Sequence, residues 1–171
     1  MELGNTQLEQ GDLAAARKSF EETRSLAQSF PGAIAAPEIE MAFARLSFAD
    51  GHFADAASPA RRALIGFTRA GREGDRFEAA AVLTRALVAQ GSVAEASEVL
   101  AQVPSPDARK LPAESVLRFE IARCFVLART GRREEAVRAM EIVNASAARS
   151  GLPKLAREAL QAKKALLKTA V

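Results

Sequence analysis

Four glycines recur along this chain at one fixed spacing. They are Gly11, Gly51, Gly91 and Gly131, and each is followed five positions later by an alanine: Ala16, Ala56, Ala96 and Ala136. A period of this length is typical of proteins built from stacked structural repeats, in which each unit packs only against its neighbours. The period therefore predicts an elongated core and a function based on a binding surface rather than on an enclosed catalytic pocket.

The composition favours helices over strands. Hydrophobic residues make up 49% of the chain, alanine and leucine are abundant, Trp and Tyr are absent, and nine Phe supply all the aromatic bulk. Alanine and leucine are strong helix formers, whereas strands favour β-branched and aromatic residues. We therefore predict an all-α fold.

Each of the four glycines stands between two helical patterns, where a tight turn requires a residue that tolerates positive φ. The repeating unit is therefore a helical hairpin. We predict first helices at about 1–10, 37–50, 75–90 and 112–130, second helices at about 12–29, 53–70, 92–103 and 133–150, and a final helix at 153–170. A single domain over 1–171 then comprises units at about 1–32, 33–71, 72–108 and 109–151, with a capping helix at 152–171.

Several residues predict local features of these helices. Asp12 and Ser92 are suitable N-caps, and Ser92 with Glu95 matches the capping-box pattern. Pro59 lies inside a predicted helix, which it should kink or delay. The alanine five residues after each glycine lies where two helices of a hairpin approach most closely, so we expect Ala96 and its equivalents to be buried.

The pattern G-x-L/F/V-x-x-A, followed four residues later by a large apolar residue, resembles the tetratricopeptide repeat (TPR). It occurs as Gly11-Leu13-Ala16-Phe20 and Gly91-Val93-Ala96-Leu100, with departures at Ala60 and Arg133 in the other two units. The family's usual period is shorter, about 34 residues. This chain is therefore similar to a 40-residue variant, as in the extended repeats of kinesin light chains and some bacterial transcriptional regulators. The resemblance implies an α-α superhelix (TPR-like solenoid) of about four helical hairpins plus a C-terminal capping helix.

The stretches GDLAAARKSFEE, SPARRAL, TRALVAQGSVAEA and LPKLAREALQAKKALL resemble the repeat region found C-terminal to bacterial serine/threonine kinase or winged-helix domains. The kinase motifs themselves, such as H-R-D and D-F-G, are absent from the sequence. Met1 falls inside a first helix, and the helix at 153–170 has no partner helix. We therefore expect the chain to be a fragment of a longer regulatory protein.

In the TPR family the first helices line a concave groove, and the position six before the glycine often holds an Asn or a basic residue that contacts a peptide. The resemblance implies a polar stripe of Asn5, Arg45 and Arg85, with Phe125 as an apolar anchor at the fourth position. Translation by the period adds further groove candidates: Met41, Phe48, Val88, Arg118 and Arg129. Arginine binds carboxylates and carbonyls through a planar fork, which suits an extended, acidic segment. The alternative is that Arg45 and Arg85 pair with Glu38, Glu40 or Glu78 on the same surface.

The chain offers few residues for catalysis or metal binding. One histidine and one cysteine cannot form a zinc site, so we expect no metal and no cofactor. Cys124 has apolar neighbours and is predicted to be a core residue, since a single cysteine cannot form an internal disulfide. His52 lies in a predicted turn that offers no pocket, so we do not expect it to be catalytic. The chain is therefore not expected to be an enzyme.

Charge and hydropathy limit the other function classes. The 24 basic and 21 acidic residues are interspersed, with a net charge of +3, which is typical of a solvated helical surface. Nucleic acid is therefore not the partner that we expect. No apolar run approaches the ~18 residues of a membrane span, and a hydrophobic leader is not evident, so we expect a cytoplasmic location without membrane contact.

The leading hypothesis is a non-catalytic scaffold that binds a peptide segment or protein domain in its concave groove, as the sensor or docking part of a multidomain bacterial regulator. A first alternative is a structural module that self-associates through its first or final helix. A second alternative is nucleic-acid binding through the small basic excess, which would weaken steeply with salt.

Overall fold

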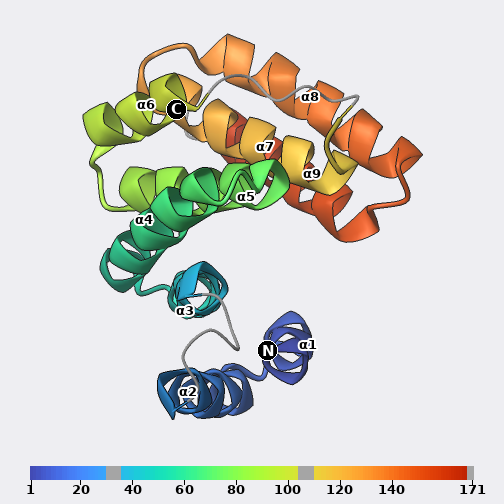
Figure 1. Cartoon of the computed structure of the whole chain (residues 1–171). Helices are drawn as coiled ribbons and strands as arrows, with labels where there is room; N and C mark the ends of the chain where they lie inside the picture. The colour runs from blue at the N-terminus through green and yellow to red at the C-terminus, as the bar shows by residue number, and fades with distance from the viewer. Residues whose placement is uncertain (30–35, 104–109, 169–171) are drawn as a thin grey trace.

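The computed structural model describes residues 1–29, 36–103 and 110–168, and within these ranges all regular secondary structure is helical (Figure 1). The helices are α1 (Glu2–Gln10), α2 (Leu13–Ser29), α3 (Ala36–Ala49), α4 (Phe53–Arg69), α5 (Glu73–Ala89), α6 (Val93–Gln102), α7 (Ala113–Arg129), α8 (Arg133–Arg149) and α9 (Pro153–Lys168). The all-α prediction is confirmed, and each predicted helix end lies within two residues of the observed one.

Glycine ends six of these helices in the same way. Gly11, Gly51, Gly71, Gly91, Gly131 and Gly151 all have positive φ, between 66° and 85°. The backbone N–H of the residue after each glycine donates to a carbonyl oxygen five residues earlier, at 2.9–3.0 Å. This pattern satisfies the last carbonyls of the helix and requires the left-handed conformation that glycine adopts without steric penalty.

The structure also shows a regularity inside the 40-residue period. The helices α4, α5, α7 and α8 each have 17 residues and are followed by a three-residue connection, so one helix with its turn spans half of the period. Gly71 and Gly151 therefore form the same turn between successive hairpins that Gly51 and Gly131 form within a hairpin. The 40-residue period is twice this shorter spacing.

The predictions for individual helix starts have mixed outcomes. Asp12 caps α2, because its Oδ1 accepts a hydrogen bond of 3.0 Å from the backbone N–H of Ala15. The predicted capping box at Ser92 was wrong, since Ser92 makes no side-chain cap hydrogen bond, and Glu95 pairs with Arg61 of α4 instead. Pro59 does not delay α4, which begins at Phe53 and continues through the proline.

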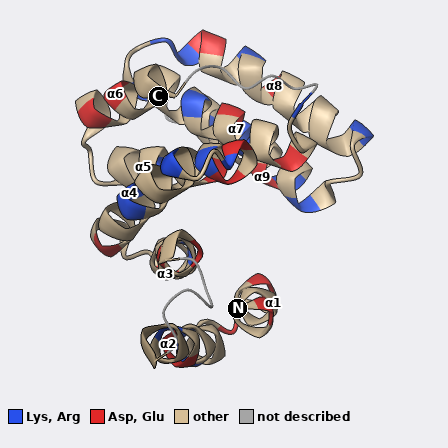
Figure 2. Cartoon of the chain, viewed as in Figure 1, with Lys and Arg blue, Asp and Glu red and all other residues tan. Residues whose placement is uncertain are grey.

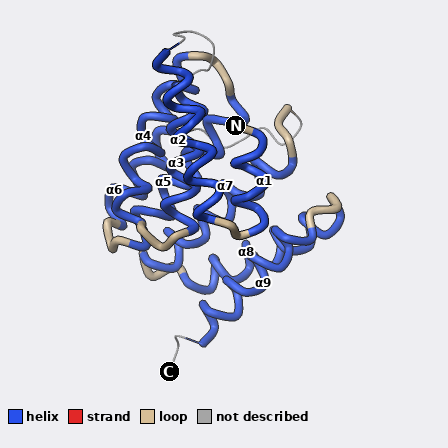
Figure 3. Tube along the Cα trace, turned by 90° about the horizontal axis from the view of Figure 1, so that it is seen from below, coloured by secondary structure: helices blue, strands red, loops and turns tan. Residues whose placement is uncertain are grey.

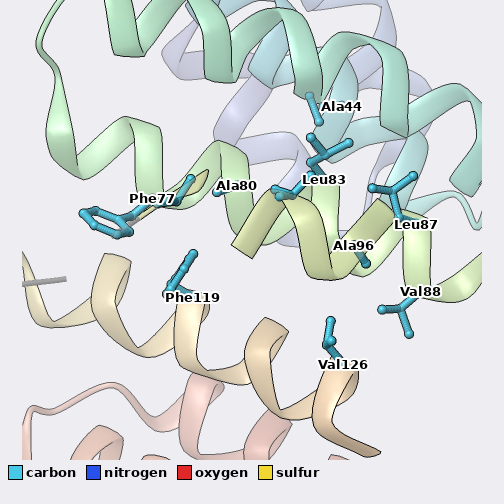
Figure 4. Close-up of a cluster of buried hydrophobic side chains, with 12 residues drawn as sticks. Ala44, Phe77, Ala80, Leu83, Leu87, Val88, Ala96, Phe119 and Val126 are labelled. Carbon is cyan, nitrogen blue, oxygen red and sulfur yellow. The ribbon is translucent and has the colours of Figure 1, made fainter. Parts of the chain in front are cut away.

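The largest core cluster joins α5, α6 and α7 with parts of α3 and α4 (Figure 4). Phe77 of α5 and Phe119 of α7 meet edge to face, with ring centroids 5.1 Å apart. Ala96 is completely buried in this cluster, as are its equivalents Ala16, Ala56 and Ala136 in their units. The predicted burial of all four alanines is confirmed.

Smaller clusters extend the core toward both ends of the chain. Phe20 of α2 packs with Ala42 and Leu46 of α3, which joins the first hairpin to the second. At the other end, α9 buries Leu155 and Ala159 against α7 and α8. Figure 3 shows α9 alongside α8, and this packing gives the last helix the position of a cap on the stack.

Residues of both charge signs are interspersed along the helices (Figure 2). Ion pairs link neighbouring helices, as between Arg62 of α4 and Glu40 of α3, at 2.8 Å. Among the helices described, none is both long and apolar enough to cross a membrane.

Candidate binding groove

The first helices of four successive hairpins, α1, α3, α5 and α7, line one cavity of about 450 Å³, which we call the charged cavity. Its walls carry three arginines and three glutamates among polar and small apolar residues. The lining residues are Asn5, Leu8, Glu9, Arg45, Phe48, Ala49, Glu78, Ala81, Val82, Arg85, Pro112, Glu114, Ser115 and Arg118.

Ion pairs within this cavity occupy two of its arginines. Arg45 of α3 pairs with Glu78 of α5. Arg118 of α7 pairs with Glu114 one turn earlier, at 2.7 Å, and lies 3.9 Å from the same Glu78. Burial lowers the pKa of Arg118, but the hydrogen bond and charge of Glu114, together with the charge of Glu78, raise it overall. Both guanidinium groups are therefore held by carboxylates of the same cavity.

Arg85 is the most constrained of the three arginines. Its Nη1 lies 2.6 Å from Oε1 of Glu158 on α9. Its guanidinium carbon also lies 4.8 Å from the ring centroid of Phe48 and 5.6 Å from that of Phe125. Burial lowers the pKa of Arg85, and the charge and hydrogen bond of Glu158 oppose this shift. Such stacking on aromatic rings is favourable for a guanidinium group.

Beyond Arg85 lies a second cavity of about 340 Å³, which we call the apolar cavity. It is formed where α3, α5 and α7 end, together with the start of α4 and the end of α9. Seven of its lining residues are apolar and two are arginines: Phe48, Phe53, Val88, Ala89, Phe125, Ala128 and Leu166, with Arg85 and Arg129. Phe48 and Arg85 line both cavities, so Arg85 forms part of the wall between them.

Comparison with known proteins identifies the fold. No family model matches this sequence, and no curated protein matches it. The structure is similar to the crystal structure of a putative kinesin light chain of Podosopora anserina with nearly identical TPR-like repeats. The similarity has a TM-score of 0.63 at 22% sequence identity and covers 99% of this chain and 94% of the other. The chain has a TPR-like repeat fold.

In this TPR-like fold, eight of the nine predicted groove residues line one or both cavities. Asn5, Arg45 and Arg118 line the charged cavity, Val88, Phe125 and Arg129 line the apolar cavity, and Phe48 and Arg85 line both. The prediction that Met41 lines the groove needs correction. Met41 is 5% exposed and packs on Phe67 of α4 and Ala79 of α5, because the end of α4 covers this part of α3. Binding by the other eight stays a prediction.

The alternative that the stripe arginines pair with nearby carboxylates is confirmed for Arg45, whose partner is Glu78. It was wrong about Glu38 and Glu40, which pair with Arg72 and Arg62. The partner of Arg85 is Glu158, which that alternative did not name. One signal was available, since Glu158 is the single carboxylate in a final helix of five basic residues. Phe53 and Leu166 also line the apolar cavity and were not among the predicted groove residues.

The other chemically distinctive residues lie outside both cavities. Cys124 is completely buried, as predicted, and burial raises the pKa of its thiol to about 11. His52 is exposed and lies 3.2 Å from Oδ2 of Asp50. In the part of the chain that the structure describes, no group of three His, Cys, Asp or Glu residues could hold a metal ion.

Proposed function

We propose that this TPR-like chain is a non-catalytic scaffold that binds a peptide segment or protein domain along α1, α3, α5 and α7. The observation that carries this proposal is the charged cavity, which four successive first helices line with convergent Asn, Arg and Glu side chains. Cavities of several hundred Å³ with a few placed polar groups are typical of binding sites.

The charged residues of the groove limit which kinds of peptide segment can bind there. The charged cavity is lined by Glu9, Glu78 and Glu114 as well as by its three arginines. A purely acidic segment would bind Arg45 and Arg118 only by displacing Glu78 and Glu114 from them, which costs part of the energy that the new pairs supply. We therefore propose a segment that carries both acidic and basic side chains, with its acidic residues competing for Arg45 and Arg118.

We further propose that the scaffold is the docking part of a multidomain bacterial regulator that acts in the cytoplasm. The support is the resemblance of stretches such as GDLAAARKSFEE to the repeat regions of such regulators. A scaffold of this kind would bring a partner to a regulatory domain without catalysing a reaction itself.

The proposed function can be tested by a substitution that blocks the groove without changing its charged residues. Ser115 lines the charged cavity on α7 and is half-buried, so Ser115→Trp places a large ring in the groove. The control is Ala94→Trp, because Ala94 is exposed on α6 outside both cavities. Proteins retained from a cell lysate by the parent and by Ala94→Trp should be lost with Ser115→Trp. Retention of the same proteins at the same strength by both variants would contradict the proposal, provided that urea unfolding shows both to be folded.

A second candidate is self-association through the final helix. Leu160 and Leu167 of α9 are 38% and 53% exposed, which favours contact with another apolar surface. Light scattering should then show a mass that rises with concentration, and Leu160→Gln with Leu167→Gln should abolish the rise. A concentration-independent monomeric mass would exclude this function.

A further inference from the structure

We propose that the apolar cavity is the specificity subsite of the groove. It accepts an apolar side chain of the ligand, and the carboxylate of the adjacent ligand residue pairs with Arg129. This inference rests on the proposed function, because it assumes that a peptide segment lies in the groove, and it specifies which chemistry of that segment is recognised.

The lining of the cavity defines the side chain that it accepts. Phe48 and Phe53 meet edge to face with ring centroids 5.2 Å apart, and Phe125, Val88 and Leu166 complete an apolar surface. Transfer of apolar area from water into such a surface is favourable by about 25 cal/mol per Å². A third aromatic ring packs well against two existing ring edges, so an aromatic or branched aliphatic side chain fits this site.

Arg129 differs from the other arginines of the groove. Arg45, Arg85 and Arg118 each pair with a glutamate of another turn or helix. Arg129 is exposed at the end of α7, and no acidic group within the described residues lies within ion-pair distance of it. A ligand carboxylate can therefore pair with Arg129 without first displacing a carboxylate of residues 1–29, 36–103 or 110–168.

Arg85 cannot take this role as easily, although it also lines the apolar cavity. Its guanidinium lies over the rings of Phe48 and Phe125 and is bound to Glu158. A ligand carboxylate would have to break this ion pair and leave Glu158 without its partner. The ligand carboxylate therefore pairs with Arg129, and Arg85 keeps its ion pair and forms part of the cavity wall.

The test uses three small probes that differ mainly in charge: N-acetyl-Phe-Glu-amide, N-acetyl-Phe-Gln-amide and N-acetyl-Phe-Lys-amide. Each is titrated into the full chain with labelled methyl groups, followed by NMR. The methyl signals of Val88 and Leu166 report on the apolar cavity, and those of Val82 report on the charged cavity. We expect Val88 and Leu166 to shift, with the Glu probe binding about fivefold more tightly than the Lys probe, since an exposed ion pair contributes up to about 1 kcal/mol.

Charge reversal at Arg129 then separates recognition from simple apolar binding. Arg129→Glu should reverse the preference, so that the Lys probe binds more tightly than the Glu probe. Arg123→Glu is the matched control, because Arg123 is exposed on the same helix and lines neither cavity. It should leave the preference for the Glu probe unchanged.

Three outcomes would overturn the inference. The first is an unchanged preference in Arg129→Glu, which would leave Arg129 only its role of complementing the dipole of α7. The second is a shift of Val82 without Val88 or Leu166, which would place the ligand in the charged cavity and leave the proposed function standing. The third is that no methyl signal in either cavity responds to any probe. The retention experiment with Ser115→Trp tests the proposed function separately.

Discussion

Arg85 of α5 and Glu158 of α9 form an ion pair of 2.6 Å that joins the third hairpin to the final helix. The side chains are 23% and 31% exposed, so the pair is neither at the open surface nor fully buried. Exposed ion pairs contribute up to about 1 kcal/mol, whereas removal of one partner of a buried pair costs about 3–5 kcal/mol. The pair therefore contributes to the docking of α9 on the stack.

Glu158→Gln should lower the free energy of unfolding by about 1–2 kcal/mol, because it leaves the guanidinium of Arg85, which lies over the rings of Phe48 and Phe125, without its counter-ion. Urea unfolding measures this effect. Glu134→Gln is the control, since Glu134 is 92% exposed and lies 3.7 Å from Arg138. Equal unfolding midpoints for the two variants would show that the pair has no greater effect than a surface contact.

Ala96→Leu should destabilise the chain by about 1–3 kcal/mol, because Ala96 is completely buried at the approach of two helices and a larger side chain would force them apart. The midpoint of denaturant unfolding measures the change. Ala94→Leu adds the same atoms to the exposed face of the same helix and should have little effect. A midpoint unchanged in Ala96→Leu would contradict the close approach of α5 and α6 at this residue.

Two helical glycines should respond to alanine with opposite signs. A Cβ at Gly66 of α4 would overlap the ring of Pro37, so Gly66→Ala should destabilise the fold. A Cβ at Gly74 of α5 would lie 3.7 Å from Cδ of Pro112, an ordinary contact, so Gly74→Ala should stabilise it by up to about 1 kcal/mol. Thermal unfolding of both variants tests this difference, and a stabilised Gly66→Ala would refute the close packing of α4 on α3.

Cys124 should react with a thiol reagent only when the chain unfolds. Its thiol is buried, and burial raises its pKa from 9.0 to about 11. Ellman's reagent near pH 8 should therefore label the native chain slowly and the urea-unfolded chain at once. Rapid labelling of the native chain would contradict this burial.

The raised pKa of Cys124 also predicts a pH dependence. The unfolded thiol ionises near pH 9 and the folded thiol near pH 11, so the unfolded state binds fewer protons between these values. The contribution of Cys124 to stability is present below pH 9 and is lost as the pH rises toward 11. Cys124→Ala should reduce this loss in urea unfolding, because it removes the titrating group.

The sequence predicted the helices well because their end signals are local. A glycine with positive φ ends a helix through its own backbone, and the helical spacing of apolar residues identifies the buried face. The capping-box prediction at Ser92 was wrong for the opposite reason. Glu95 has a partner in a neighbouring hairpin, Arg61, and this tertiary ion pair competes with the local hydrogen bond.

Translation by the 40-residue period placed eight of the nine groove candidates on the cavity walls, but it could not find contacts between different units. The pairing of Arg85 with Glu158 joins α5 to α9 across different units, and a pattern that repeats from unit to unit does not contain such a contact. The same limit explains Met41, which occupies a suitable position on α3 but is covered by Phe67 of α4. The 40-residue period therefore predicted which residues share a helix face. Packing between neighbouring helices determines which of these residues are accessible.

The turns at Gly51, Gly71, Gly131 and Gly151 have one backbone conformation although they alternate between joining helices within a hairpin and joining hairpins. Nothing in the turn therefore tells a helix whether it is the first or the second of its unit. That identity lies only in which of its faces is apolar. Duplication of one full period would therefore lengthen the array and leave every later helix in its present role. Duplication of a single helix with its turn would exchange the first-helix and second-helix positions of all later helices, so that their groove residues would lie on the side opposite the groove.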